Sequence, residues 1–152
     1  MELRDQVYNL GQIYARLCKA ANMNSLNNPQ SYERACRQPM REITIIYIQK
    51  LRGRLSKEDN EYVGIRFNDI DADNDLLFGG ALPIELQGVF QLGYHHSQEE
   101  KTVKELIVRT GYNQIEIAEK LGVTPTTVSR WASGSVKISQ ENIYKIERLR
   151  KP

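Results

Sequence analysis

The stretch that decides the fold of the C-terminal third is NQIEIAEKLGVTPTTVSRWASG, residues 113–134. It contains two helix starts: Asn113 is a favoured N-cap, and Thr124 is another, with Pro125 at the first helical position. Between them, Gly122 stands where a tight turn between helices requires a positive φ. The stretch therefore predicts two short helices joined by a turn.

We expect these helices over 114–121 and from 125 to about 132. A small residue is needed where two crossing helices come closest, and Ala118 supplies it. Val128 and Trp131 are three residues apart, so they share one face of the second helix. This face is predicted to be buried, which leaves the opposite face of the second helix directed outward.

The flanking sequence adds a lead helix over 102–109, ended by Gly111, and a closing helix after Ser139. The aliphatic residues expected to point inward are Val103, Leu106, Ile107, Ile117, Ala118, Leu121, Ile143, Ile146 and Leu149. Over these roughly fifty residues the chain resembles the helix-turn-helix of the phage-repressor (XRE-like) family. The resemblance implies that the chain binds duplex DNA, with the second helix of the motif in the major groove.

The outward positions give the candidate contacts. Arg130 is the best candidate for a bidentate contact to guanine, and the threonines could contact a thymine methyl or a phosphate. Gln114 and Lys137 resemble positions that hold phosphates, while Ser129 on the flank could serve either purpose. The predicted DNA-binding residues are Gln114, Thr124, Pro125, Thr126, Thr127, Ser129, Arg130 and Lys137. One alternative is a plain helical bundle in which Pro125 and the threonines serve only as helix-capping and surface residues. The other is a helix-turn-helix used for contact with a protein.

The composition is that of an ordinary globular protein, with 40% hydrophobic and 26% charged residues in 152. Residues 1–100 contain 11 Lys/Arg and 14 Asp/Glu, whereas residues 101–152 contain 10 and 5. The basic excess therefore falls in the C-terminal third, where a nucleic-acid footprint would place it. No apolar run approaches the roughly 20 residues of a membrane span, and the N-terminus lacks the apolar core of a signal peptide, so we expect a cytoplasmic protein without membrane contact.

The sequence offers no catalytic or metal-binding constellation. Cys18 and Cys36 are expected to be free thiols. A zinc site that adds His95 and His96 is disfavoured, because adjacent histidines on a helix point about 100° apart. We therefore predict no enzyme activity, no cofactor and no metal.

The first hundred residues have helical apolar spacing, so the whole chain is predicted to be all-α. We expect a helical domain over residues 1–98 and the helix-turn-helix domain over 99–152. Within the first domain, the predictions are a helix over 3–21, a loop over 22–30, a short helix capped by Ser31 and ending at Gln38, a helix over 40–55, a less regular acidic stretch over 56–82, and a helix that Pro83 opens. Ile84, Leu86, Val89, Phe90 and Tyr94 are expected to form the apolar face of that last helix, in which Gly88 and Gly93 mark a close helix approach or weaken it.

Two segments of this domain carry a second resemblance: VYNLGQIYARLCKAAN (7–22) and LPIELQGVFQLGYHHSQ (82–98). They resemble the C-terminal helical region of the large subunit of the type I-C CRISPR interference complex (Cascade), a region also produced separately as its small subunit. SYERACRQPMREITIIYIQKL (31–51) fits the middle of that region. The resemblance implies a small-subunit-like helical bundle with Cascade subunits as partners. The family's domain carries basic residues toward the displaced DNA strand, whereas residues 1–100 of this chain have a net charge of −3, so we expect the domain to hold DNA poorly.

These observations lead to one hypothesis and two alternatives. The hypothesis is an anti-CRISPR regulator that mimics the small subunit, blocks capture of target DNA by Cascade and represses a promoter, its own, through the helix-turn-helix. The first alternative is a functional small subunit with an added DNA-binding module. The second is a plain transcriptional repressor whose N-terminal domain forms a homodimer, since such repressors usually bind palindromes as dimers.

Overall fold

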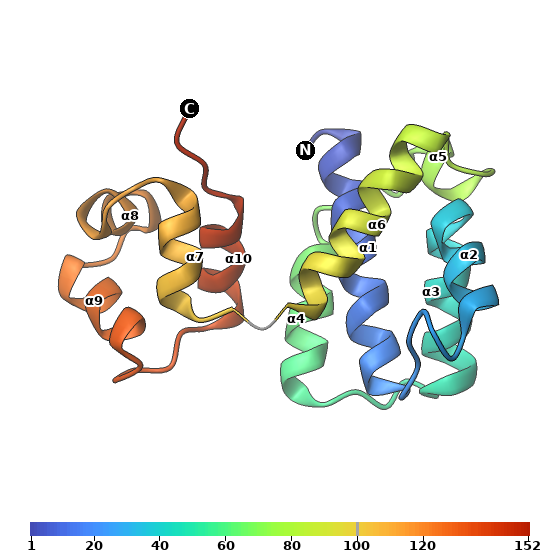
Figure 1. The fold of residues 1–152 in the computed structure, drawn as a ribbon, viewed down its shortest axis with the longest axis horizontal. Coiled ribbons are helices and arrows are strands. Elements are labelled where there is room, and N and C mark those ends of the chain that lie inside the picture. Colours follow the sequence, from blue (N-terminus) through green and yellow to red (C-terminus); the bar gives the residue numbers. More distant parts are fainter. Residues whose placement is uncertain (100) are drawn as a thin grey trace. The chain divides into compact units, whose positions relative to one another are not determined.

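The computed structural model describes residues 1–99 and 101–152, and every regular element in them is a helix (Figure 1). The chain divides into two compact units, Met1–Glu99 and Glu100–Pro152, each with its own hydrophobic core. The predicted all-α class is confirmed. None of the helices in the described ranges is long and apolar enough to cross a membrane.

The N-terminal unit is built around its first helix. Its elements are α1 (Leu3–Ala20), α2 (Pro29–Arg37), α3 (Pro39–Ile45), the π-helical turn η1 (Ile46–Lys50), α4 (Lys57–Phe67), α5 (Asp75–Phe78) and α6 (Ile84–Gln98). α1 packs mainly against α6 and also contacts α4 and α3 (Figure 1). Eleven residues of α1 are buried, and most of them are apolar. Their helical spacing is the pattern that predicts a long helix from the sequence.

Two glycines allow α1 and α6 to pack backbone against backbone. A Cβ at Gly11 would collide with the Phe90 carbonyl, and a Cβ at Gly93 would collide with the Tyr8 carbonyl. Of the two roles that the sequence left open for Gly93, close helix approach and weakening of the helix, the structure shows the close approach. Gly88, one turn earlier in α6, has open space around it.

Several polar side chains are buried in this unit with partners. Arg66 is fully buried; its Nε donates to Gln12 Oε1 at 2.9 Å, and its guanidinium lies 3.5 Å from the centre of the Tyr62 ring. Glu42, 2% exposed, accepts from Ser31 Oγ at 2.9 Å and from Arg34 Nε at 2.7 Å. Burial of these charged groups is tolerable because each is hydrogen-bonded.

The prediction that Ser31 caps the second helix was wrong. That helix begins at Pro29, and Ser31 lies inside it, buried and 2.9 Å from the Tyr14 hydroxyl. The Asn-rich loop is correspondingly shorter. Serine is favoured at caps because it bonds its own backbone, but here its hydroxyl joins α1 to Glu42.

Four further predictions in this unit need correction. The helix predicted over 40–55 ends at residue 50, because Arg52 and Gly53 adopt left-handed conformations with φ of 52° and 70°. The stretch expected to be irregular contains α4, whose N-cap Ser56 accepts from the Asp59 amide at 3.1 Å. Pro83 is the N-cap of α6 rather than its first residue, and Ile84, expected to be inward, is 79% exposed.

The C-terminal unit consists of α7 (Val103–Thr110), α8 (Gln114–Leu121), α9 (Pro125–Ser133) and α10 (Gln140–Arg148). Thr102 and Ser139 cap α7 and α10, and Gly111 ends α7 with φ of 78°. The core of the unit comprises Ile107, Ile117, Ala118, Val128, Trp131, Ile138 and Ile146. The four helices predicted for this part of the chain are confirmed, and the inward aliphatic residues lie in or against this core.

Candidate nucleic-acid interface

The turn between α8 and α9 has the geometry that the sequence predicted. Gly122 has φ of 70°, and the Val123 amide donates to the Ala118 carbonyl at 2.9 Å. Ala118 is 1% exposed, so the two helices meet over a methyl group. Val128 and Trp131, at 0% and 6% exposed, anchor α9 in the core. One face of α9 is thereby fixed inward, and the other is free to meet a ligand.

The N-terminus of α8 carries a capping box. The Asn113 side chain accepts from the Glu116 amide at 2.8 Å, and the Asn113 amide donates to Glu116 Oε2 at 2.9 Å. The amides of Gln114 and Ile115, at the first two helical positions, find no acceptor among the described residues. Unpaired amides at a helix N-terminus are suited to bind a phosphate. The predicted residue Gln114 is half-buried at this end of α8.

The predicted threonines of α9 have different surroundings. Thr124 Oγ1 accepts from the Thr127 amide at 3.2 Å and lies 2.8 Å from the Thr127 hydroxyl. These two hydroxyls are therefore held against each other, and Thr127 is half-buried. Pro125 and Thr126 are exposed in the first turn. Thr126 is the threonine whose hydroxyl is left available.

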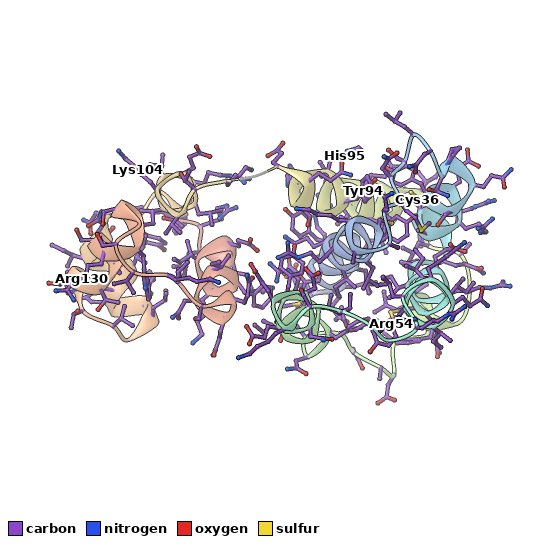
Figure 2. All side chains as sticks on the ribbon, turned by 90° about the horizontal axis from the view of Figure 1, so that it is seen from below. Cys36, Arg54, Tyr94, His95, Lys104 and Arg130 are labelled. Atoms are coloured by element: carbon purple, nitrogen blue, oxygen red, sulfur yellow. The ribbon has the colours of Figure 1, made fainter. Side chains whose placement is uncertain are left out.

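Arg130 and Ser129 lie on the exposed face of α9. No partner is found for the Arg130 guanidinium within the part of the chain that the structure describes, and in Figure 2 the side chain extends away from the unit. The neighbouring Trp131 is buried, which fixes the part of the helix from which Arg130 projects. A guanidinium on a rigid exposed helix face can donate two parallel hydrogen bonds to a guanine edge.

A tight turn after α9 positions the next candidate. Gly134 has φ of 79°, and the Arg130 carbonyl accepts from the Ser135 amide at 3.0 Å. Ile138 then enters the core, 8% exposed, while the preceding Lys137 is exposed. Lys137 is thus presented next to the end of α9 on a constrained segment. The outward face of α9 was predicted from the sequence. The Ile115 amide was not named there, although Asn113 as N-cap implies that the first helical amides lack intrahelical partners.

The basic charge of this unit is distributed over its surface. Lys145 Nζ lies 3.3 Å from Glu141 Oε1, and Lys151 Nζ lies 3.9 Å from Glu116 Oε1. Lys120 Nζ lies over the Tyr112 ring, 4.6 Å from its centre. Lys104 projects from α7, away from Arg130 (Figure 2). The sequence places the basic excess in this third of the chain, but α9 itself carries one cation, Arg130. DNA recognition by the exposed face of α9 would therefore depend on a few individual side chains and not on a dense basic surface.

The comparison with protein families agrees with this geometry. Residues 103–149, which span α7 to α10, match the family model described as Helix-turn-helix. The C-terminal unit is a helix-turn-helix domain, the class found in DNA-binding regulators. Comparison with curated proteins and with solved structures gives no match.

The titratable residues of the N-terminal unit do not converge on a metal site. The described residues contain no group of three or more His, Cys, Asp or Glu that could hold a metal ion. His96 Nδ1 lies 2.7 Å from the Tyr8 hydroxyl, whereas His95 faces Tyr32, so the two histidines point to different partners. Cys18 and Cys36 are buried free thiols, as predicted.

Proposed function

We propose that the protein is a transcription regulator that recognises a specific duplex sequence through α9. In this proposal Arg130 contacts a base edge in the major groove, and Thr126 and Ser129 contact the same groove beside it. The free amides at the start of α8, together with Lys137, hold phosphates on either side. The proposal rests on one observation above all: a rigidly anchored helix presents an unpaired guanidinium outward, within a helix-turn-helix domain.

The test separates specific from general binding. A duplex selected by the full-length protein from a randomised library would be titrated by fluorescence anisotropy beside an unrelated duplex. We expect Arg130→Ala to weaken binding of the selected duplex by roughly 1–3 kcal/mol while leaving the unrelated duplex little changed. Lys145→Ala removes an exposed charge on α10 and is the matched control. Equal losses in the two variants, or no duplex binding by the wild type, would refute the proposal.

We further propose that the N-terminal unit takes the place of the small subunit in a type I-C Cascade and blocks capture of target DNA. The two segments that carry the sequence resemblance, 7–22 and 82–98, correspond to α1 and α6, which pack directly on each other through Gly11 and Gly93. This pairing supports the proposal, because the resembling residues form one continuous core rather than scattered surface. The helix-turn-helix domain would then repress the promoter from which the inhibitor itself is expressed.

The corresponding experiment is co-expression with a type I-C Cascade that lacks its small subunit, followed by titration of the isolated complex with target DNA. Incorporation of the protein without DNA capture supports the inhibitor. Incorporation with restored capture would make it a working small subunit that carries a DNA-binding module. Failure to incorporate would leave the chain as a transcription regulator without a role in Cascade.

A further inference from the structure

The N-terminal unit is strongly segregated in charge, although its net charge is small. Residues 34–57 contain seven Lys/Arg and one Asp/Glu, whereas residues 58–99 contain one Lys/Arg and nine Asp/Glu. The first range covers the last turn of α2, then α3, η1 and the loop into the start of α4, and the second covers the rest of α4, α5 and α6. The charge of the whole unit therefore says little about what any one of its surfaces can bind.

The basic range ends in an exposed patch that also contains apolar side chains. On η1, Tyr47 is 39% and Ile48 60% exposed. The loop residues fold back onto this turn, since the Gly53 amide donates to the Tyr47 carbonyl at 3.0 Å. Arg52 and Arg54 are exposed, and neither makes an ion pair within the described residues. We call Tyr47, Ile48, Lys50, Arg52 and Arg54 the basic end.

The acidic range contains a second patch of exposed apolar side chains. Leu76 and Phe78 on α5 are 45% and 50% exposed, and Ile84 at the start of α6 is 79% exposed. Exposed carboxylates accompany them in the preceding loop and in the first turns of α5 and α6. We call the acidic end the set of Asp71, Asp73, Asp75, Leu76, Phe78, Ile84 and Glu85.

The two patches lie at opposite ends of the bundle. The Asp71 amide donates to Gln6 Oε1 at 2.7 Å, which places the acidic loop beside the first turns of α1. Arg16, in the last turns of α1, pairs with Asp59 at 3.2 Å, close to where the loop from η1 enters α4. Figure 1 shows the same arrangement, with α5 at the upper end of the unit and the loop into α4 at the lower end. Gln6 and Arg16, which mark the two places, are ten residues apart on α1, about 15 Å along its axis, so the two patches of one copy lie apart.

We propose that the protein associates with itself head to tail, the basic end of one copy docking on the acidic end of the next. Each patch offers apolar area to bury and charges of the sign that the other lacks, which is the complementarity expected of partner surfaces. The proposed occupant of each patch is therefore a second copy of this chain. The inference goes beyond the proposed function and does not depend on it.

A head-to-tail contact has a consequence for assembly. A two-fold interface joins the same patch on both copies, whereas this contact joins two different patches, so the copies extend as an open row unless the rotation between neighbours closes a ring. If α9 reads DNA as proposed, successive domains in such a row favour direct repeats over the palindromes bound by two-fold dimers.

The test uses the nuclease-treated full-length protein in sedimentation velocity, without added DNA. Two double variants alter exposed side chains only: Ile48→Ser with Arg54→Gln at the basic end, and Ile84→Ser with Glu85→Gln at the acidic end. We expect the wild type to form species that grow with concentration, and to lose about tenfold in association constant when the salt is raised enough to screen surface charge. Each variant alone is expected to be monomeric.

The decisive sample is an equimolar mixture of the two variants. Each retains one intact end, so the mixture is expected to form 1:1 pairs that grow no further. A monomeric wild type, unchanged association of either variant, or a mixture that stays monomeric beside an associating wild type would overturn the proposal. So would a basic-end variant that associates normally but binds DNA more weakly, because the patch would then serve nucleic acid. Circular dichroism melting of both variants checks that they remain folded.

Discussion

Replacing Gly93 by alanine tests the backbone packing of α1 on α6. The added Cβ would overlap the Tyr8 carbonyl oxygen and lie 3.0 Å from the Tyr8 carbonyl carbon and 3.3 Å from the Gln12 amide nitrogen. Backbone atoms cannot rotate aside, so we take the upper part of the range for overpacking, about 3 kcal/mol. Alanine regains about 1 kcal/mol of helix propensity. The N-terminal unit should therefore lose about 2 kcal/mol of unfolding free energy.

Gly88→Ala in the same helix is the matched control. Nothing lies within 4 Å of its added Cβ, so it keeps only the propensity gain of about 1 kcal/mol. With a urea dependence of about 1.5 kcal/mol per molar, the two variants should differ by roughly 2 M in midpoint. Far-UV circular dichroism follows both units, whereas fluorescence of Trp131, the single tryptophan, reports the C-terminal core. Equal midpoints for the two variants would refute the packing argument, as would a loss confined to the Trp131 signal.

Three further predictions concern other parts of the chain. Gly122→Ala should cost the C-terminal unit roughly 1–2 kcal/mol, measured by Trp131 fluorescence in urea, because φ of 70° is strained for alanine even though the space around it is open. Lys137→Gln should reduce the slope of log Kd against log salt by about 1 if this lysine holds a phosphate, and an unchanged slope would exclude that role. Burial raises the pKa of the Cys18 thiol from 9.0 to about 11, so its contribution to stability is complete below pH 9 and is lost as the pH rises through 11. The urea midpoint of the N-terminal unit should fall over that interval, and fall less in Cys18→Ala.

The helix-turn-helix was predictable because its signals are local. Asn113, Gly122 and Thr124 act on partners within four residues, and their roles as caps or left-handed turn were confirmed. In the N-terminal unit the same local rules failed at Ser31, whose hydroxyl bonds Tyr14 and Glu42 instead of its own helix. They also failed at Arg52, since a left-handed arginine has no distinct sequence signal.

The sequence by itself determined the all-α class, the four C-terminal helices and the face of α9 that is turned outward. Periodicity and capping suffice for these features, because each depends on neighbours along one helix. Only the tertiary structure decided that Gly93 packs against α1 while Gly88 faces open space, and that Arg66 is fully buried. It also decided that the basic and acidic ends lie at opposite ends of α1. These features depend on residues distant in sequence, whose approach is set by how whole helices pack.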